Sequence, residues 1–316
     1  MATNRTSETP GVAPDVLTVY RDAFLRSLSA ENKSPRTRQS YGEAVNLMAA
    51  FLRTHALPAA PELITREHLT AWINDMLATW KSATAANRYR GASRFFAYLV
   101  EAGELKESPM ARMKPPKTEE MEVPIIRDVD LQRLLKSCEG KDFRDRRDFA
   151  LVLAFLDTGL RVNEMASLKL QPDFDTDSWV DVDDGVFWVV GKGRRQRRVP
   201  LGNKARKALD HYLFVRTRHA YASEKSFWIG ERGRIGPSGL YQIIERRCEL
   251  AGIPRIHPHQ FRHTFAHKLQ AANINDSDLM YLAGWKSREM LNRYGASAAA
   301  ERAIDAHRRP SPADRL

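Results

Sequence analysis

Four short motifs in the second half of the chain carry side chains that suit chemistry on a phosphate. In the first, Arg161 follows a glycine-containing helix break at Gly159, and Glu164 lies three residues further along. At that spacing both side chains share one face of a helix, where a carboxylate can fix the planar guanidinium for a phosphate. Backbone N–H groups near a helix start also favour anions. Taken by itself, this motif is better explained as a surface ion pair.

The second motif is a basic loop between two apolar runs. Lys192 lies between Gly191 and Gly193, a pattern typical of a β-hairpin. A lysine at the flexible tip of such a hairpin can reach into a groove and donate a proton. The arginines around it are Arg194, Arg195, Arg197 and Arg198. The alternative is a solvated basic turn.

The third motif places imidazole and guanidinium groups on one helix. His259 and Arg262 are three residues apart and project together. This pair suits a transferring phosphoryl group, because one side chain handles protons and the other handles charge. The rival interpretation is a metal site, because His259, His263 and His267 recur every four residues. We expect no metal, since there is no His-Glu-x-x-His pattern and no cysteine or carboxylate ligand nearby.

The fourth motif begins where Gly284 ends a helix and Ser287 can cap the next one. Trp285 offers a packing surface and one N–H donor, and Tyr294 places a phenol late on the following helix. A lone tyrosine in such a position most often packs with its ring buried and its hydroxyl wet. The motif therefore carries little information when it is taken alone.

A run of aspartates offers a competing kind of site. Its members are Asp173, Asp175, Asp177, Asp181, Asp183 and Asp184. A calcium-binding EF-hand loop needs glycine at its sixth position, where this chain has Ser178, and ends in glutamate rather than in Asp184. We predict a solvated, turn-forming loop here, and neither a calcium site nor a two-metal nuclease.

Helical patterns fill the first part of the chain. Residues 1–14 have no periodicity and predict a disordered leader. Residues 15–108 predict an N-terminal bundle of four helices. The helices are expected over Val16–Leu28, after Ser34-Pro35, after Thr65, and from Ser82 to near Gly103. The last of them carries Arg88, Arg90 and Arg94, which either face a groove in a partner or are solvated.

A proline-rich stretch over residues 109–123 predicts an extended linker to a second domain, residues 124–316. Within that domain we expect helices near Val129–Cys138 and Phe143–Asp157. Three short strands are expected at Trp179–Val182, Val186–Val190 and Arg198–Leu201. The remainder, from Lys204 to about Arg308, is expected to be helical and to end in a short amphipathic helix over 298–308. The predicted fold class is therefore mainly α, with one small three-stranded sheet in the second domain.

Composition narrows the class of partner. The chain has 316 residues, a length that suits two domains. Its formal net charge is +11, of which +3 falls in the first 120 residues and +8 in the rest. Residues 191–218 hold ten Lys or Arg and one acid. Such clustering is typical of a polyanion partner, although a solvated basic face explains the charge equally well.

Composition also excludes several classes of protein. Hydrophobic residues make up 43% of the chain, which is incompatible with a wholly disordered protein. The longest apolar candidate, Phe149–Leu156, is far shorter than the roughly 20 residues that a membrane span needs. Two cysteines, Cys138 and Cys248, cannot form a disulfide scaffold or a four-thiolate zinc site. No signal peptide is evident, so we expect a soluble, cytoplasmic protein.

Together and in this order, the motifs resemble the catalytic domain of the tyrosine recombinases, the phage integrase family that includes the Xer and Cre enzymes. That family combines an arginine with a nearby acid, a hairpin lysine, His-x-x-Arg, a His or Trp, and a nucleophilic tyrosine. The matching residues are Arg161, Glu164, Lys192, His259, Arg262, Trp285 and Tyr294. Trp285 stands where most members have histidine. The resemblance covers residues 124–300 by motif, whereas the N-terminal bundle resembles the SAM-like core-binding domain by length and helix count only.

The resemblance implies a site-specific DNA recombinase or integrase that works through a covalent 3′-phosphotyrosine. Tyr294 would attack the scissile phosphate and free a 5′-hydroxyl, with His259 accepting the phenolic proton and Lys192 protonating the leaving oxygen. Arg161 and Arg262 would clamp the non-bridging oxygens. Glu164 would orient Arg161, and Trp285 would complete the pocket. Because one diester replaces another, neither ATP nor a metal cofactor is implied.

The resemblance also implies partners. They are double-stranded DNA at paired recombination sites, a homotetramer assembled on it by exchange of the C-terminal helix, and accessory recombination proteins for some tasks. The expected location is then the nucleoid. For DNA contacts we predict six arginines: Arg88, Arg90, Arg94, Arg194, Arg195 and Arg197. Two alternatives keep the same residues, namely a type IB topoisomerase-like relaxing enzyme and a non-catalytic DNA-binding regulator.

Overall fold

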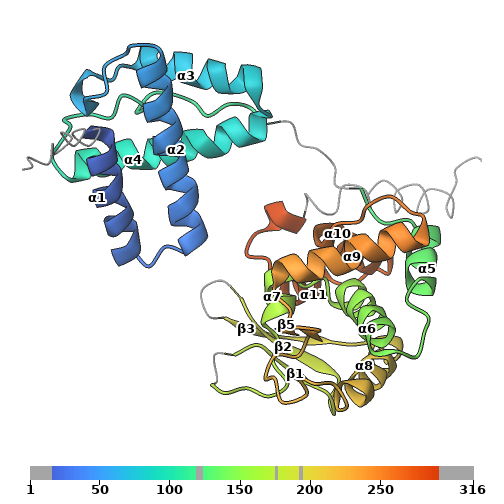
Figure 1. The fold of residues 1–316 in the computed structure, drawn as a ribbon. Helices are drawn as coiled ribbons and strands as arrows, with labels where there is room; N and C mark the ends of the chain where they lie inside the picture. The colour runs from blue at the N-terminus through green and yellow to red at the C-terminus, as the bar shows by residue number, and fades with distance from the viewer. Residues whose placement is uncertain (1–15, 119–123, 175–176, 192–194, 292–316) are drawn as a thin grey trace, which may run out of the picture. The chain divides into compact units, whose positions relative to one another are not determined.

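The computed structural model of the protein describes residues 16–118, 124–174, 177–191 and 195–291 (Figure 1). The chain forms two compact units that divide between Met121 and Glu122. Each unit has its own hydrophobic core. No helix in the described ranges is long and apolar enough to cross a membrane.

The described part of the first unit is helical, as its sequence pattern predicts. Its elements are α1 (Val16–Ala30), α2 (Pro35–Thr54), the 3₁₀ turn η1 (Pro61–Leu63), α3 (Arg66–Thr79) and α4 (Ser82–Glu101). Ser34 caps α2, because its hydroxyl accepts the Thr37 N–H at 3.1 Å. Thr65 caps α3 in the same way. α4 begins at Ser82, where the sequence pattern predicts a helix to start, and Lys81 occupies the N-cap position without a side-chain cap bond.

Part of the predicted linker belongs to this first unit. Met110 is 3% exposed and packs in the core of the bundle. The hydroxyl of Tyr89 donates to the Met113 carbonyl at 2.7 Å. Both contacts tie the start of the proline-rich stretch to the helices, so an extended connection cannot begin at residue 109.

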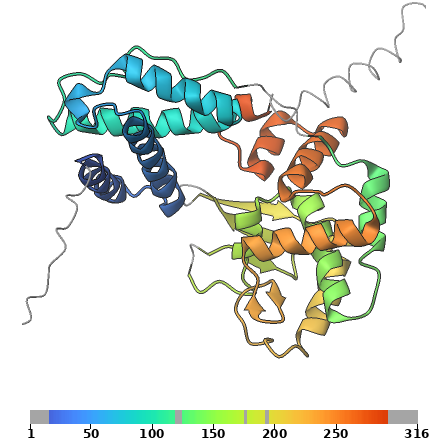
Figure 2. The same cartoon turned by 45° about the horizontal axis from the view of Figure 1, so that its top comes forward.

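The second unit combines helices with two small antiparallel sheets. Its helices are α5 (Asp128–Lys136), α6 (Phe143–Thr158), α7 (Val162–Ser167), α8 (Asn203–Arg216), α9 (Pro237–Ala251), α10 (Pro258–Ala271) and α11 (Asp276–Ala283). The larger sheet has the order β1 (Trp179–Asp181), β2 (Val186–Val190), β3 (Gln196–Pro200). The central helix α6 packs against α8 and α10, and α11 packs against β3. Figure 2 shows the unit turned, with the sheet to one side of these helices.

The three-stranded sheet has one buried and one partly open face, because side chains alternate along each strand. Phe187, Val189 and Val199 are buried on the inner face. On the outer face Trp179, Trp188 and Arg198 stand in register. The two indole rings stack with centroids 5.8 Å apart, and the Arg198 guanidinium lies 5.4 Å from the Trp188 ring.

One expectation for this unit is wrong. The stretch from Lys204 onward is not helical throughout, because β4 (Ile229–Gly230) and β5 (Gly233–Arg234) form a second, two-stranded sheet. Strands of two residues are too short to show periodicity in the sequence. The local signal for a hairpin here is the pair Gly230 and Gly233. Gly233 has φ +88°, a conformation that suits a tight turn.

Candidate active site

The first motif lies at the junction of α6 and α7. Gly159 ends α6 in the left-handed conformation, and Arg161 immediately precedes α7. The Glu164 carboxylate accepts the Arg161 backbone N–H at 2.9 Å and its Nη1 at 3.1 Å. The Arg161 side chain remains 44% exposed. Because α7 has only six residues, a helix dipole adds little to this site, and the guanidinium itself supplies the charge.

A second arginine completes the environment of Glu164. Arg197 on β3 donates from Nη1 to Oε1 at 3.1 Å and from Nη2 to Oε2 at 2.9 Å. Its Nε donates to the Leu282 carbonyl at 2.9 Å. Arg197 is 6% exposed, so its guanidinium is committed inside the protein. The prediction that Arg197 contacts DNA is therefore wrong, because its side chain is buried and binds Glu164 and Leu282.

The two arginines control the charge of Glu164. Burial alone would raise the pKa of this carboxyl, but the hydrogen bonds and charge of Arg197, followed by those of Arg161, outweigh it. The pKa of Glu164 is therefore held below its usual value. The carboxylate stays ionised at neutral pH and can orient the Arg161 fork.

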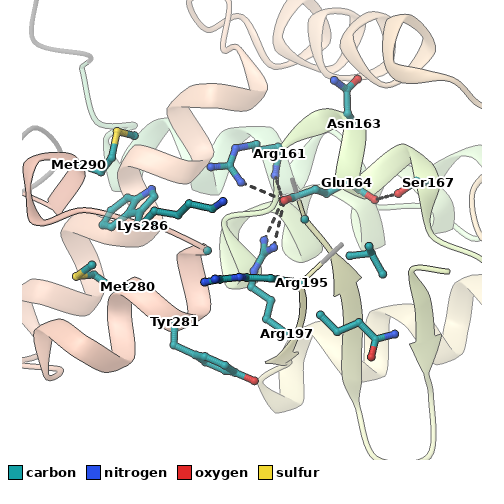
Figure 3. Close-up of a pocket in the computed structure, with 15 residues that line it drawn as sticks. Arg161, Asn163, Glu164, Ser167, Arg195, Arg197, Met280, Tyr281, Lys286 and Met290 are labelled. Carbon is teal, nitrogen blue, oxygen red and sulfur yellow. Dashed lines mark hydrogen bonds and ion pairs between the residues drawn. The ribbon is translucent and has the colours of Figure 1, made fainter. Parts of the chain in front are cut away.

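These groups line a cavity of about 860 Å³ between α7, the β2–β3 hairpin and the segment from α11 to Met290. Arg161, Arg195 and Lys286 extend toward the same space (Figure 3). Among the described lining residues Glu164 is the single acid, and Arg197 balances its charge. The cavity is therefore positively charged, as a site for a phosphodiester requires.

Lys286 lines the cavity but was not predicted from the sequence. It follows Trp285 directly, and nothing in its local pattern distinguishes it from any exposed lysine. The turn after α11 decides its direction, because Gly284 adopts φ +63° and the Trp285 N–H binds the Met280 carbonyl at 2.9 Å. This turn sets Trp285 and Lys286 together at the cavity.

The hairpin lysine lies outside the described residues. Lys192 and Arg194 fall within 192–194, which the structure does not describe. The two residues that flank this gap are joined by a bond from the Gly191 N–H to the Arg195 carbonyl at 2.9 Å. Both line the cavity. The described ends of the loop thus reach the same space as Arg161.

Arg262 is buried beside this cavity. It is 1% exposed and donates from Nη1 to the Gly159 carbonyl at 2.9 Å and from Nη2 to the Ala283 carbonyl at 2.6 Å. Its guanidinium lies 5.4 Å from the centroid of the Trp285 ring. Arg262 therefore ties the end of α6 to the end of α11, and it is not among the described lining residues.

The histidines of α10 separate into exposed and buried members. His259 is exposed in the first turn, and its ring centroid lies 5.0 Å from that of His263. His263 and His267 are buried. Within the described ranges no group of three or more His, Cys, Asp or Glu side chains is placed to hold a metal ion.

The expected nucleophile, Tyr294, lies outside the described residues, as does the predicted C-terminal helix over 298–308. The described chain ends at Leu291, and Met290 lines the cavity. Tyr294 is therefore four residues along the chain from a lining residue. Trp285, which is 6% exposed, also lines the cavity.

The three arginines expected to contact DNA from the first unit all lie on α4. Each of them has a bonding partner within the first unit. Arg88 forms an ion pair with Glu43 at 2.8 Å, and Arg94 pairs with Glu31 and Glu101. Arg90 is exposed, and its Nε donates to a carbonyl of its own helix. These contacts leave Arg90 as the most accessible of the three.

The aspartate run forms local contacts in the described residues. Lys169 Nζ binds Asp173 at 2.9 Å and Asp177 at 2.8 Å. Asp177 also accepts the backbone N–H groups of Asp173 and Phe174, and Asp181 accepts the Asp184 N–H. These bonds fold the acidic segment into turns.

Comparison with known proteins identifies the fold and its family. A model of the phage integrase family matches residues 125–301, and a model of the phage integrase N-terminal SAM-like domain matches residues 20–106. The chain belongs to the phage integrase family. It is a tyrosine recombinase, and the resemblance seen in its motifs is confirmed.

Individual members of the phage integrase family agree with this assignment. The chain is 31% identical to the tyrosine recombinase XerC of Pseudomonas aeruginosa strain PAO1 over 258 residues, which cover 78% of this chain and 80% of that protein. It is 32% identical to XerC of Azotobacter vinelandii over 263 residues, covering 78% and 81%.

Solved structures of other recombinases share the fold. A lambda integrase dimer bound to a COC′ core site matches with a TM-score of 0.66 at 18% identity, covering 88% of this chain and 94% of that one. The XerH site-specific recombinase bound to a palindromic difH substrate matches with a TM-score of 0.68 at 17% identity, covering 93% and 96%. The predicted mainly helical fold class, with its small sheet, is thereby confirmed.

Proposed function

We propose that this tyrosine recombinase cleaves and rejoins DNA at specific sites through a phosphotyrosine formed by Tyr294. The observation that carries the proposal is the positively charged cavity that Arg161, Arg195 and Lys286 line, while the charge of Glu164 is already balanced by Arg197. Such a cavity has an affinity for a phosphodiester and offers donors where negative charge builds in the transition state. Comparable donors are worth about 10²–10³ in rate each.

The phosphate would bind against Arg161, which Glu164 holds in place. Tyr294 would attack the phosphorus and displace the 5′-oxygen of the DNA strand. A phenol has a pKa of about 10, so it needs a proton acceptor at neutral pH. The exposed imidazole of His259 is our candidate acceptor, and Lys192 is our candidate donor to the leaving oxygen.

Trp285 and Arg262 form the remainder of the site. The Trp285 ring would close the cavity around the phosphate and offer its indole N–H. Arg262 would clamp a phosphate oxygen, and its bonds to the carbonyls of Gly159 and Ala283 can persist, because each terminal nitrogen carries two N–H groups. Since Arg262 is 1% exposed and does not line the cavity, we propose that residues around it shift when DNA binds.

The second strand's 5′-hydroxyl would attack the phosphotyrosine by the reverse path. The tyrosyl diester conserves the free energy of the original bond, so the cycle needs neither ATP nor a metal. A lambda integrase tetramer bound to a Holliday junction has the same fold, with a TM-score of 0.64 at 19% identity. We extend its stoichiometry to this chain and propose a homotetramer on two DNA sites, with accessory proteins where the task needs them. We propose that it acts at the nucleoid, because its proposed substrate is DNA.

The test is a nicked suicide substrate built from inverted repeats near the coding region, located by footprinting. Wild-type protein is expected to form a covalent protein–DNA adduct, and Tyr294→Phe is expected to bind the DNA without forming one. Tyr241→Phe, which removes a hydroxyl on α9 outside the cavity, is the matched control and is expected to form the adduct. An adduct that persists in Tyr294→Phe would refute the assignment of the nucleophile.

A further inference from the structure

The buried guanidinium of Arg197 joins three separate elements of the second unit. Both its terminal nitrogens bind Glu164 on α7, and its Nε binds the Leu282 carbonyl at the end of α11, while its own backbone lies in β3. Figure 3 shows Arg197 beside Glu164, on the opposite side of the carboxylate from Arg161. All three elements contribute to the wall of the cavity.

The cost of burying this pair suggests a purpose other than stability. An ion pair removed from water commonly stabilises a fold no more than well-packed apolar side chains of the same volume. What the pair provides is a carboxylate with one fixed orientation. Oε1 accepts from the side chains of Arg161 and Arg197, and Oε2 accepts from the Arg161 backbone and from Arg197. The carboxylate is held from two sides and cannot rotate.

We propose that Arg197 is a positioning residue for the phosphate-binding arginine, acting on Arg161 through Glu164. Its bond to Leu282 also fixes the turn that presents Trp285 and Lys286, so the two walls of the cavity keep one spacing. This inference rests on the proposed function, because it gives Arg161 the phosphate as its ligand.

The same contacts predict a pH dependence. Glu164 faces Arg161 from the start of α7 and Arg197 from β3, and Arg195, Tyr281 and Lys286 line the same cavity. Burial raises the pKa of Glu164 and Arg197 is the largest influence that lowers it. Without Arg197 the pKa of Glu164 rises. In a variant that lacks the Arg197 guanidinium, the Glu164 carboxylate therefore takes up a proton at a higher pH than it does in the wild-type protein. A protonated Glu164 no longer orients Arg161 by charge.

The experiment is single-turnover cleavage of the suicide substrate across a pH range, with Arg197→Met and Arg197→Lys. We expect Arg197→Met to lower the cleavage rate about ten- to a hundredfold, by analogy with residues that orient the ligands of a bound metal ion. DNA affinity should change by less than about threefold, since Arg197 is buried, and the rate should fall further at acidic pH. Arg197→Lys keeps the positive charge but loses the bidentate guanidinium. It should therefore restore much of the cleavage rate that Arg197→Met loses at acidic pH, and part of the rate at neutral pH.

A matched control separates positioning from structure. Arg216 is equally buried, at 3% exposure, and donates to several backbone carbonyls, among them those of Ala222 and Glu224, but it does not line the cavity. Arg216→Lys should lower thermal stability without changing the pH profile of cleavage. In a Glu164→Gln background, Arg197→Met should cost much less than it does in the wild type, because the path through Glu164 is already broken and only the bond to the Leu282 carbonyl is left to lose.

Each result has a defined meaning. The inference would be overturned if Arg197→Met cleaved at the wild-type rate. It would also be overturned if Arg197→Met lowered the rate by the same factor in the Glu164→Gln background as in the wild-type protein. An unchanged pH profile in both Arg197 variants would do the same. Because the wild-type protein is measured in parallel, a failure of the proposed function appears as absence of any adduct, whereas a failure of this inference alone leaves the wild-type adduct intact.

Discussion

Replacement of Gly284 by alanine tests how tightly the cavity is assembled. Gly284 ends α11 at φ +63°, and a Cβ there would lie 3.0 Å from both Cζ and Nη1 of Arg197. Gly252 ends α9 at φ +61°, but a Cβ there would meet nothing within 4 Å. The two positions share one backbone conformation and differ in the neighbour. Gly252→Ala is therefore the matched control for Gly284→Ala.

The magnitude follows from this comparison. Left-handed backbone costs an alanine about 1–2 kcal/mol at either position. The smaller entropy of the unfolded chain after a Gly→Ala change applies equally to both. At Gly284 the Arg197 guanidinium must also move, although Glu164 and the Leu282 carbonyl hold it. Losing one hydrogen bond to a charged group adds about 1.5–3 kcal/mol. We expect total losses of about 2.5–5 kcal/mol for Gly284→Ala, against about 1–2 kcal/mol for Gly252→Ala.

Two assays check the expectation. For a unit of this size each kcal/mol lowers Tm by about 2–4 °C, so thermal unfolding followed by near-UV circular dichroism resolves the two variants. Single-turnover cleavage should fall in Gly284→Ala, because Arg197 and the turn before Trp285 are both displaced, and should be unchanged in Gly252→Ala. Equal stability and equal cleavage in the two variants would show that Arg197 moves freely, which would contradict the argument.

Two further changes probe the fold and the DNA contact. Asp148 is fully buried and binds Arg147, Arg246 and Arg247. Because Asp148→Ala leaves buried cations without their anion, it should lower the free energy of unfolding by about 3–5 kcal/mol. Urea titration measures this loss, and a change below 1 kcal/mol, or no larger than that of Asp210→Ala on the exposed side of α8, would contradict it. Lys286→Gln removes one cation from the cavity and should reduce the slope of log Kd against log salt by about 0.9. Fluorescence anisotropy with the duplex site measures that slope, and an unchanged slope would exclude a phosphate contact by Lys286.

Local patterns in the sequence determined most of the elements and the identity of the site. Helix caps such as Ser34 and Thr65 mark where helices begin, because they satisfy backbone N–H groups within a few residues. The motif residues are recognisable for a similar reason, since phosphate chemistry restricts the residue types that can perform it. The short strands β4 and β5 were missed because two residues carry no period.

Tertiary structure alone decided which cations face the cavity. Arg195 and Arg197 stand two residues apart in one basic run, yet the first is exposed at the cavity and the second is buried against Glu164. Alternation along β3 places Arg197 on the same face as Val199, a signal that the predicted strand missed because it began at Arg198. Residue type fixes a charge, but the direction of that charge depends on strand phase and on the turn at Gly284, and both are set by packing between segments distant in the chain.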